Sequence, residues 1–107
     1  MNETEFHRLA DATLEALSLA LEAADESGAV DVEQTDGTLT IALGDGKQFI
    51  VSKHAASRQL WLSSPVSGGL HFRYGGAGEW VLPDGRALRN VMADELSQAV
   101  HICILFS

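Results

Sequence analysis

Apolar residues near the N-terminus recur at steps of three and four positions, which is the period of one face of an α-helix. The set comprises Phe6, Leu9, Ala10, Leu14, Leu17, Ala20, Leu21 and Ala24. Asn2 can serve as the N-cap, and Ser27-Gly28 supplies a C-terminal stop. We therefore predict a long amphipathic helix from Glu3 to about Glu26.

After this helix the hydrophobic period changes to two, as in a strand with one face in water. Asp36-Gly37 then marks a tight hairpin turn. We predict six strands, at about 30–33, 38–43, 47–53, 58–63, 70–74 and 79–81, followed by a second helix at about 86–98. Because the connections between the strands are short, the sheet should be mainly antiparallel.

This order of elements predicts the fold class α+β. An antiparallel sheet between two terminal helices can bury one face under both helices and leave the other in water, which gives a two-layer sandwich. The 107 residues suit one domain, and no linker or repeat divides them. The tail at about 100–107 is unusually apolar, and we expect it to pack in the groove of the helices.

Charge is distributed unevenly along this acidic chain. The net charge is −8, but residues 1–45 hold eleven acids against one base, a local charge of −10. Such a field disfavours nucleic acid and anionic lipid and favours cations or a basic protein surface; the alternative is that it only keeps the protein soluble. The chain shows no signal peptide and no apolar run long enough to span a membrane, which predicts a cytoplasmic protein.

The polar face of the first helix carries the candidate metal ligands. Glu3, His7, Asp11 and Glu15 follow one another at four-residue spacing, and more acids continue to the first strand. Cys103 is the sole cysteine, so a metal must be held by oxygen or imidazole. Carboxylates along a helix do not converge, which favours weak binding of several ions. His7 could add a nitrogen ligand or could be a plain solvated histidine.

A second candidate surface lies on the fourth strand. Placing Leu60 and Leu62 against the helices puts Gln59 and Trp61 on the wet face, where a large aromatic side chain can contact a partner. The alternative is an edge tryptophan covered by a neighbouring strand, whereas Trp80 should belong to the core. No nucleophile lies beside a base and no glycine-rich phosphate loop occurs, so we expect no enzymatic activity.

Several motifs occur in the order typical of one known family. The run from Asn2 to Asp11 resembles the start of bacterial frataxins. Asp31-Val32-Glu33, Gly37-Thr38-Leu39-Thr40-Ile41, Gln59-Leu60-Trp61-Leu62-Ser63 and Gly68-Gly69-Leu70-His71-Phe72 with Trp80 look like its successive strand motifs. The resemblance covers about residues 1–98 and implies a frataxin-like fold.

The resemblance also implies iron and partners. A frataxin would bind Fe²⁺ or Fe³⁺ weakly on an acidic ridge and act on the cysteine desulfurase and the scaffold protein of iron–sulfur cluster assembly, as a regulator or iron chaperone. The metal-binding candidates are then Glu3, His7, Asp11, Glu15, Glu22, Asp25, Glu26, Asp31 and Glu33, and the partner-binding candidates are Glu22, Asp25, Glu26, Gln59 and Trp61. The alternative function is an acidic protein–protein adaptor without a physiological metal.

Overall fold

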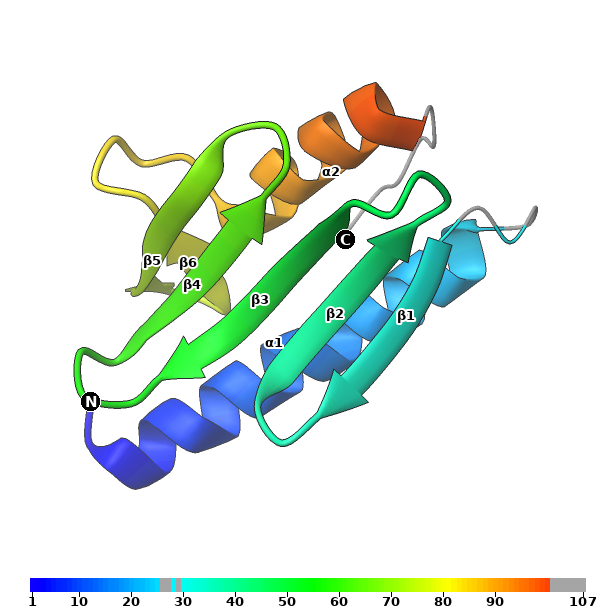
Figure 1. Ribbon diagram of the computed structural model, residues 1–107. Coiled ribbons are helices and arrows are strands. Elements are labelled where there is room, and N and C mark those ends of the chain that lie inside the picture. The colour runs from blue at the N-terminus through cyan, green and yellow to red at the C-terminus, as the bar shows by residue number, and fades with distance from the viewer. Residues whose placement is uncertain (26–27, 29, 101–107) are drawn as a thin grey trace.

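Two helices and six strands, in the predicted order, make up the part of the chain that the structure describes. The computed structural model describes residues 1–25, 28 and 30–100 (Figure 1). The elements are α1 (Glu3–Ala24), β1 (Val30–Thr35), β2 (Thr38–Leu43), β3 (Gln48–His54), β4 (Gln59–Ser64), β5 (Gly68–Gly76), β6 (Glu79–Val81) and α2 (Leu88–Val100).

Polar caps define both ends of α1. The Asn2 side chain accepts a hydrogen bond from the Glu5 amide at 2.7 Å, which satisfies one of the free N–H groups of the first turn. The helix ends at Ala24 with Asp25 as its C-cap, and the Asp25 amide donates to the Leu21 carbonyl at 3.0 Å. The predicted end at Glu26 is therefore close, although Glu26 and Ser27 themselves lie outside the described residues.

The strands form one antiparallel sheet in which each strand pairs with its neighbours in the chain, from β1 at one edge to β6 at the other. Asp36 and Gly37 join β1 to β2 with φ values of 28° and 78°. The type I′ hairpin turn needs positive φ at both of its central residues, as found here, which favours Asp-Gly at this position. The hairpin brings Val30 opposite Leu43 and Glu33 opposite Thr40.

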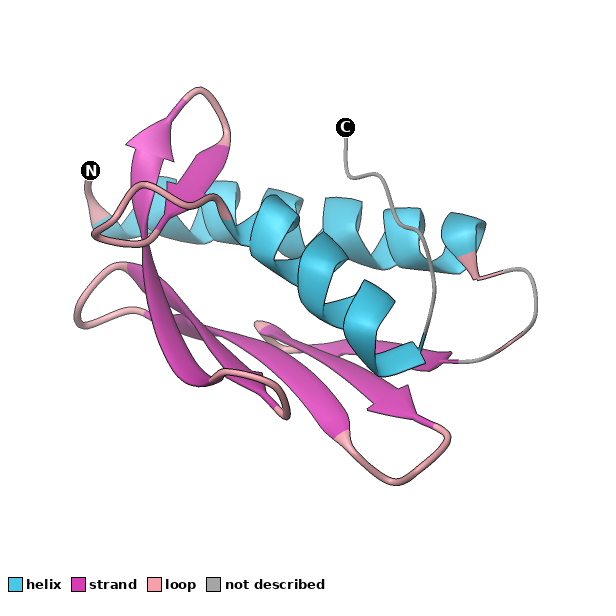
Figure 2. Cartoon of the chain, turned by 90° about the horizontal axis from the view of Figure 1, so that it is seen from above, coloured by secondary structure: helices cyan, strands magenta, loops and turns pink. Residues whose placement is uncertain are grey.

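Both helices cover the same face of the sheet, and Figure 2 shows the two layers from above. The core lies between these layers, and Leu14, Ile41, Phe49 and Met92 in it are fully buried. Trp80 is also buried, as predicted, and its Nε1 donates to Thr13 Oγ1 at 2.8 Å. The expected two-layer α+β sandwich is confirmed.

The second helix begins two residues later than its hydrophobic period suggested. The Leu82 amide donates to the Arg86 carbonyl at 2.9 Å, and Val81 forms an isolated bridge with Ala87. These contacts keep residues 86 and 87 out of the helix, which starts at Leu88.

The apolar C-terminal tail beyond Val100 lies outside the described residues, and its expected packing stays a prediction. Among the helices of the described residues, none has the length and apolar character needed to cross a membrane.

Candidate functional site

α1 runs beside β1, an edge strand of the sheet (Figure 1). Acidic residues lie along both elements. Glu15 and Glu22 are exposed on α1, and Asp31 and Glu33 are exposed on β1. Asp31 and Glu33 face solvent because Val30 and Val32, which alternate with them along β1, point toward the core. Together with Asp25, these four acidic residues form what we call the acidic edge.

Asp25 differs from the other members of the acidic edge because it also stabilises the fold. It caps α1 and is half-buried, and its Oδ2 accepts a hydrogen bond from the Val30 amide at 3.0 Å. This bond ties the end of the helix to the start of β1. Glu26, which was predicted to belong to the same surface, lies outside the described residues.

Two of the predicted ligands nearer the N-terminus, His7 and Asp11, contact a lysine. Lys53, at the end of β3, places its Nζ 2.8 Å from Asp11 Oδ1 and 3.1 Å from His7 Nδ1. The Nε2 of His7 lies 3.6 Å from Glu3 Oε1. The four-residue spacing therefore does bring Glu3, His7 and Asp11 onto one stripe, but an ammonium group lies between two of them.

Nowhere in the described part of the chain do three or more histidine, cysteine, aspartate or glutamate side chains converge on a point that could hold a metal ion. Tight iron or calcium sites need several ligands at one point. The acidic edge can instead offer one or two oxygens per ion, with water completing the coordination.

The outer face of the sheet carries a stack of three rings, which we call the ring stack: His54 on β3, Trp61 on β4 and His71 on β5. The ring centroids of His54 and Trp61 are 3.9 Å apart with planes at 10°, and those of Trp61 and His71 are 4.1 Å apart with planes at 8°. Trp61 and His71 are direct cross-strand partners. The prediction that Trp61 lies on the outer face is confirmed, but both faces of the indole are covered and the residue is half-buried.

Hydrogen bonds fix the orientation of the ring stack. Trp61 Nε1 donates to Gln59 Oε1 at 2.9 Å, and the Ser57 hydroxyl donates to the same oxygen at 3.1 Å. Because its hydrogen is used in this way, Ser57 Oγ accepts from His54 Nδ1, 2.6 Å away. When neutral, His54 therefore carries its hydrogen on Nδ1 and leaves Nε2 as an acceptor.

The outer face of the sheet is electrostatically divided. Asp31 and Glu33 lie on β1, whereas Arg73 on β5 is exposed beside the ring stack, opposite Gln59. A partner can therefore meet negative charge at one side of the sheet, and aromatic and basic groups at the other.

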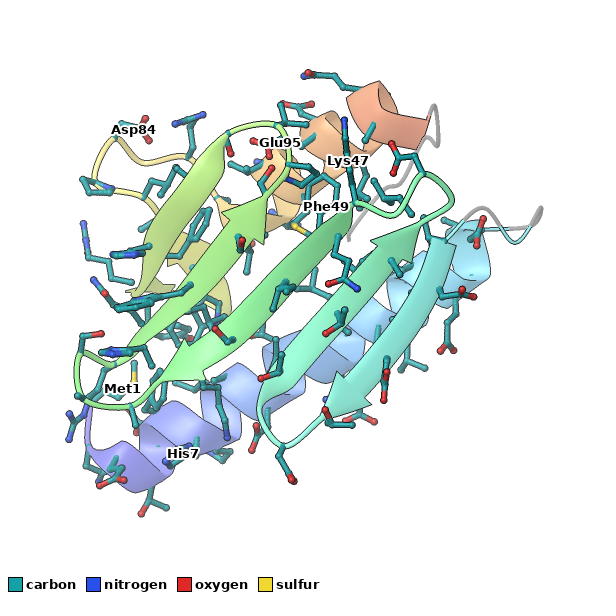
Figure 3. The ribbon with its side chains drawn as sticks, in the orientation of Figure 1. Met1, His7, Lys47, Phe49, Asp84 and Glu95 are labelled. Atoms are coloured by element: carbon teal, nitrogen blue, oxygen red, sulfur yellow. The ribbon has the colours of Figure 1, made fainter. Side chains whose placement is uncertain are left out.

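Sequence reasoning missed two features of these surfaces. It left His54 and His71 without a role, because their contact depends on the register of three strands. It also gave no sign that Glu95 of α2 is buried, with an exposed fraction of 7%. The Glu95 carboxylate accepts hydrogen bonds from the hydroxyls of Ser64 and Ser67, and it lies at the end of the sheet where β4 turns into β5 (Figure 3).

Comparisons with known proteins agree with this architecture. A profile of the frataxin-like domain matches residues 1–102. Proteins named iron–sulfur cluster assembly protein CyaY from Vibrio cholerae and Vibrio vulnificus are each 43% identical over 82 residues, covering 76% of this chain and 74% of theirs.

Solved structures show the same fold. Frataxin from Psychromonas ingrahamii superposes with a TM-score of 0.89 at 22% identity, over 100% of this chain and 99% of that one. Trimeric frataxin from Saccharomyces cerevisiae, complexed with ferrous iron, superposes with a TM-score of 0.76 at 30% identity, over 87% of this chain and 86% of that one.

Proposed function

The chain belongs to the bacterial frataxin family, and we propose that it acts in iron–sulfur cluster assembly as an iron-binding regulator of the cysteine desulfurase and its scaffold protein. The relatives from Vibrio carry the name of cluster assembly proteins, and the yeast relative was crystallised with ferrous iron. The observation that carries the proposal is the acidic edge, where α1 and β1 run side by side and both carry exposed carboxylates. The role is regulatory, and we propose no catalytic step.

Iron would bind to the acidic edge as a loosely held ion. Glu15, Glu22, Asp31 and Glu33 are exposed carboxylates, the hard oxygen ligands that iron accepts. Since they do not surround one point, each ion would keep most of its water. Binding of this kind is weak, takes up several ions and declines as salt screens the charges.

The same charges would orient the desulfurase. Residues 1–45 carry a net charge of −10, and such a field accelerates the approach of a basic surface and sets its orientation. We propose that a basic patch of the desulfurase meets the acidic edge together with Glu26, the next residue in the sequence after Asp25. Gln59 and Trp61 would form a second contact with the partner complex. An indole already held by neighbouring rings loses little side-chain freedom when a partner covers it.

Nuclear magnetic resonance can separate the iron-binding regulator from the plain adaptor. In an anaerobic titration with Fe(II) at moderate salt, we expect the amide signals between Glu15 and Glu33 to broaden first and those of α2 to change little. A second titration with Mg²⁺ controls for ionic strength. Uniform changes, or none, would leave the adaptor as the function.

Charge reversal tests the docking of the desulfurase. The variant Glu22→Lys with Asp31→Lys should reduce desulfurase binding strongly, because it reverses two charges of the acidic edge. The control Asp84→Lys with Asp94→Lys alters the net charge equally at exposed residues outside this edge. Glu95 would be an unsuitable control, because a lysine would replace a buried carboxylate.

Both double variants are compared by biolayer interferometry at fixed ionic strength, after thermal unfolding has shown that each is folded. Equal losses would mean that only net charge matters, and docking through the acidic edge would have to be abandoned.

A further inference from the structure

We propose that Lys53 excludes iron from the N-terminal end of the acidic stripe, so that metal binds only at the acidic edge. The proposal rests on the proposed function in one respect: it takes the stripe of α1 as a surface that meets iron. It then divides that stripe in two. In the N-terminal part, Glu3, His7 and Asp11, the protein itself supplies a cation to two of the three residues. The other part, Glu15 and Glu22, belongs to the acidic edge and is left for metal.

The ammonium of Lys53 contacts two of the three N-terminal ligands, Asp11 and His7. Its Nζ lies 2.8 Å from Asp11 Oδ1 and 3.1 Å from His7 Nδ1, so one cation already contacts both. A metal ion bound to the same two atoms would have to lie against the ammonium. Two positive charges in direct contact repel strongly, and part of this repulsion persists even in water.

The contacts of His7 remove it as a nitrogen ligand. A lysine ammonium can only donate hydrogen bonds, so Nδ1 of His7 is the acceptor in this contact. In the neutral imidazole the ring hydrogen is then on Nε2, the atom that faces Glu3 Oε1 at 3.6 Å. One nitrogen is engaged by Lys53 and the other carries a hydrogen. Neither offers a free lone pair to iron.

The backbone holds Lys53 in this position. Its amide donates to the Gly37 carbonyl at 2.9 Å, and its side chain is only 18% exposed. The aliphatic stem passes over Gly37 so closely that a Cβ at position 37 would overlap Lys53 Cε. The stem is therefore guided from the end of β3 toward α1.

Tethering gives the ammonium an advantage over a dissolved ion. A group attached to the chain competes at an effective concentration in the millimolar range or above. An ion that binds weakly to one or two carboxylates cannot match it at cellular concentrations. The acidic edge has no comparable described contact with a lysine or arginine at Glu15, Glu22 or Glu33.

The test replaces Lys53 by methionine, which keeps the apolar stem and removes the charge. The matched control is Lys47→Met, which removes the same charge from an exposed lysine; Figure 3 shows Lys47 and His7 at opposite ends of the sheet. The probe is Co²⁺ alone, a paramagnetic stand-in for Fe²⁺. The ring signals of His7, assigned by comparison with His7→Gln, report on the N-terminal part.

In the unsubstituted protein and in Lys47→Met, we expect the His7 ring signals to persist at Co²⁺ concentrations that already broaden the amides of the acidic edge. In Lys53→Met, the His7 signals should broaden at about tenfold lower Co²⁺, the scale typical of changing a group beside a metal ligand. Thermal unfolding establishes that the variants are folded.

The inference is overturned if His7 broadens together with the acidic edge in the unsubstituted protein, or if Lys53→Met responds like Lys47→Met. These outcomes are distinct from failure of the proposed function, which would appear as no selective response of the acidic edge in any variant. If Co²⁺ broadens the His7 ring signals more strongly in Lys53→Met, the inference is supported even when the acidic edge shows no selective response.

Discussion

The acidic edge, on α1 and β1, and the ring stack, on β3 to β5, are organised in opposite ways. In the described residues no three acids converge on one point, whereas Trp61 is held on both faces by His54 and His71. A field of like charges acts over about a Debye length of 8–10 Å and needs no fixed contacts. Ring stacking needs fixed neighbours at a defined distance. The first surface is suited to attracting cations and partners, and the second to specifying how a partner fits.

The largest effect should come from the opposite face of α1. Leu17→Ala is expected to lower the free energy of unfolding by about 2–5 kcal/mol, because Leu17 is a core side chain and its loss leaves a cavity. Glu22→Ala, on the acidic edge, should change it by less than about 0.5 kcal/mol. Urea titrations of both variants measure the difference. Similar losses would mean that the acidic edge also supports the fold.

A smaller effect is expected at the ring stack. Trp61→Ala should lower stability by about 1–3 kcal/mol, since each of its two aromatic pairs contributes roughly 0.5–1.5 kcal/mol. A double-mutant cycle of Trp61→Ala with His71→Ala isolates the pair, and a coupling energy near zero would show that the rings are adjacent without stabilising one another.

The smallest effect should come from one carboxylate of the acidic edge. Glu33→Gln is expected to weaken Co²⁺ binding only about twofold, because an exposed charge contributes a few tenths of a kcal/mol and other carboxylates remain. Asp94→Asn, at an exposed residue of α2, serves as the control and should change nothing. Isothermal titration calorimetry measures both. A tenfold loss for Glu33→Gln would reveal a defined coordination site in place of a diffuse one.

Most of the fold could be predicted because it follows from local patterns. The three- and four-residue spacing from Phe6 to Leu21 identified the buried face of α1, and the alternation of Leu39, Ile41 and Leu43 identified that of β2. The predicted ends of helices and strands were less accurate where tertiary contacts intervene. Ala87, for example, pairs with Val81, so α2 starts after it.

The features of the candidate site that follow from local patterns could likewise be predicted. The sequence by itself determined the concentration of acids in α1 and β1, because charge follows directly from residue type and helical or strand spacing decides which side chains face solvent. It also determined that Trp61 lies on the outer face, since one alternation along β4 is enough to place it.

Only the tertiary structure decided which distant residues meet. Lys53 and His7 are in contact although they are 46 positions apart in the sequence. Glu95 accepts a hydrogen bond from Ser64, which is 31 positions away. The ring stack joins residues of three strands. Such contacts depend on strand register and on how the helices lie over the sheet, and no local period encodes either. For this reason an apparently continuous acidic stripe on α1 contains, at its N-terminal end, a cation supplied by β3.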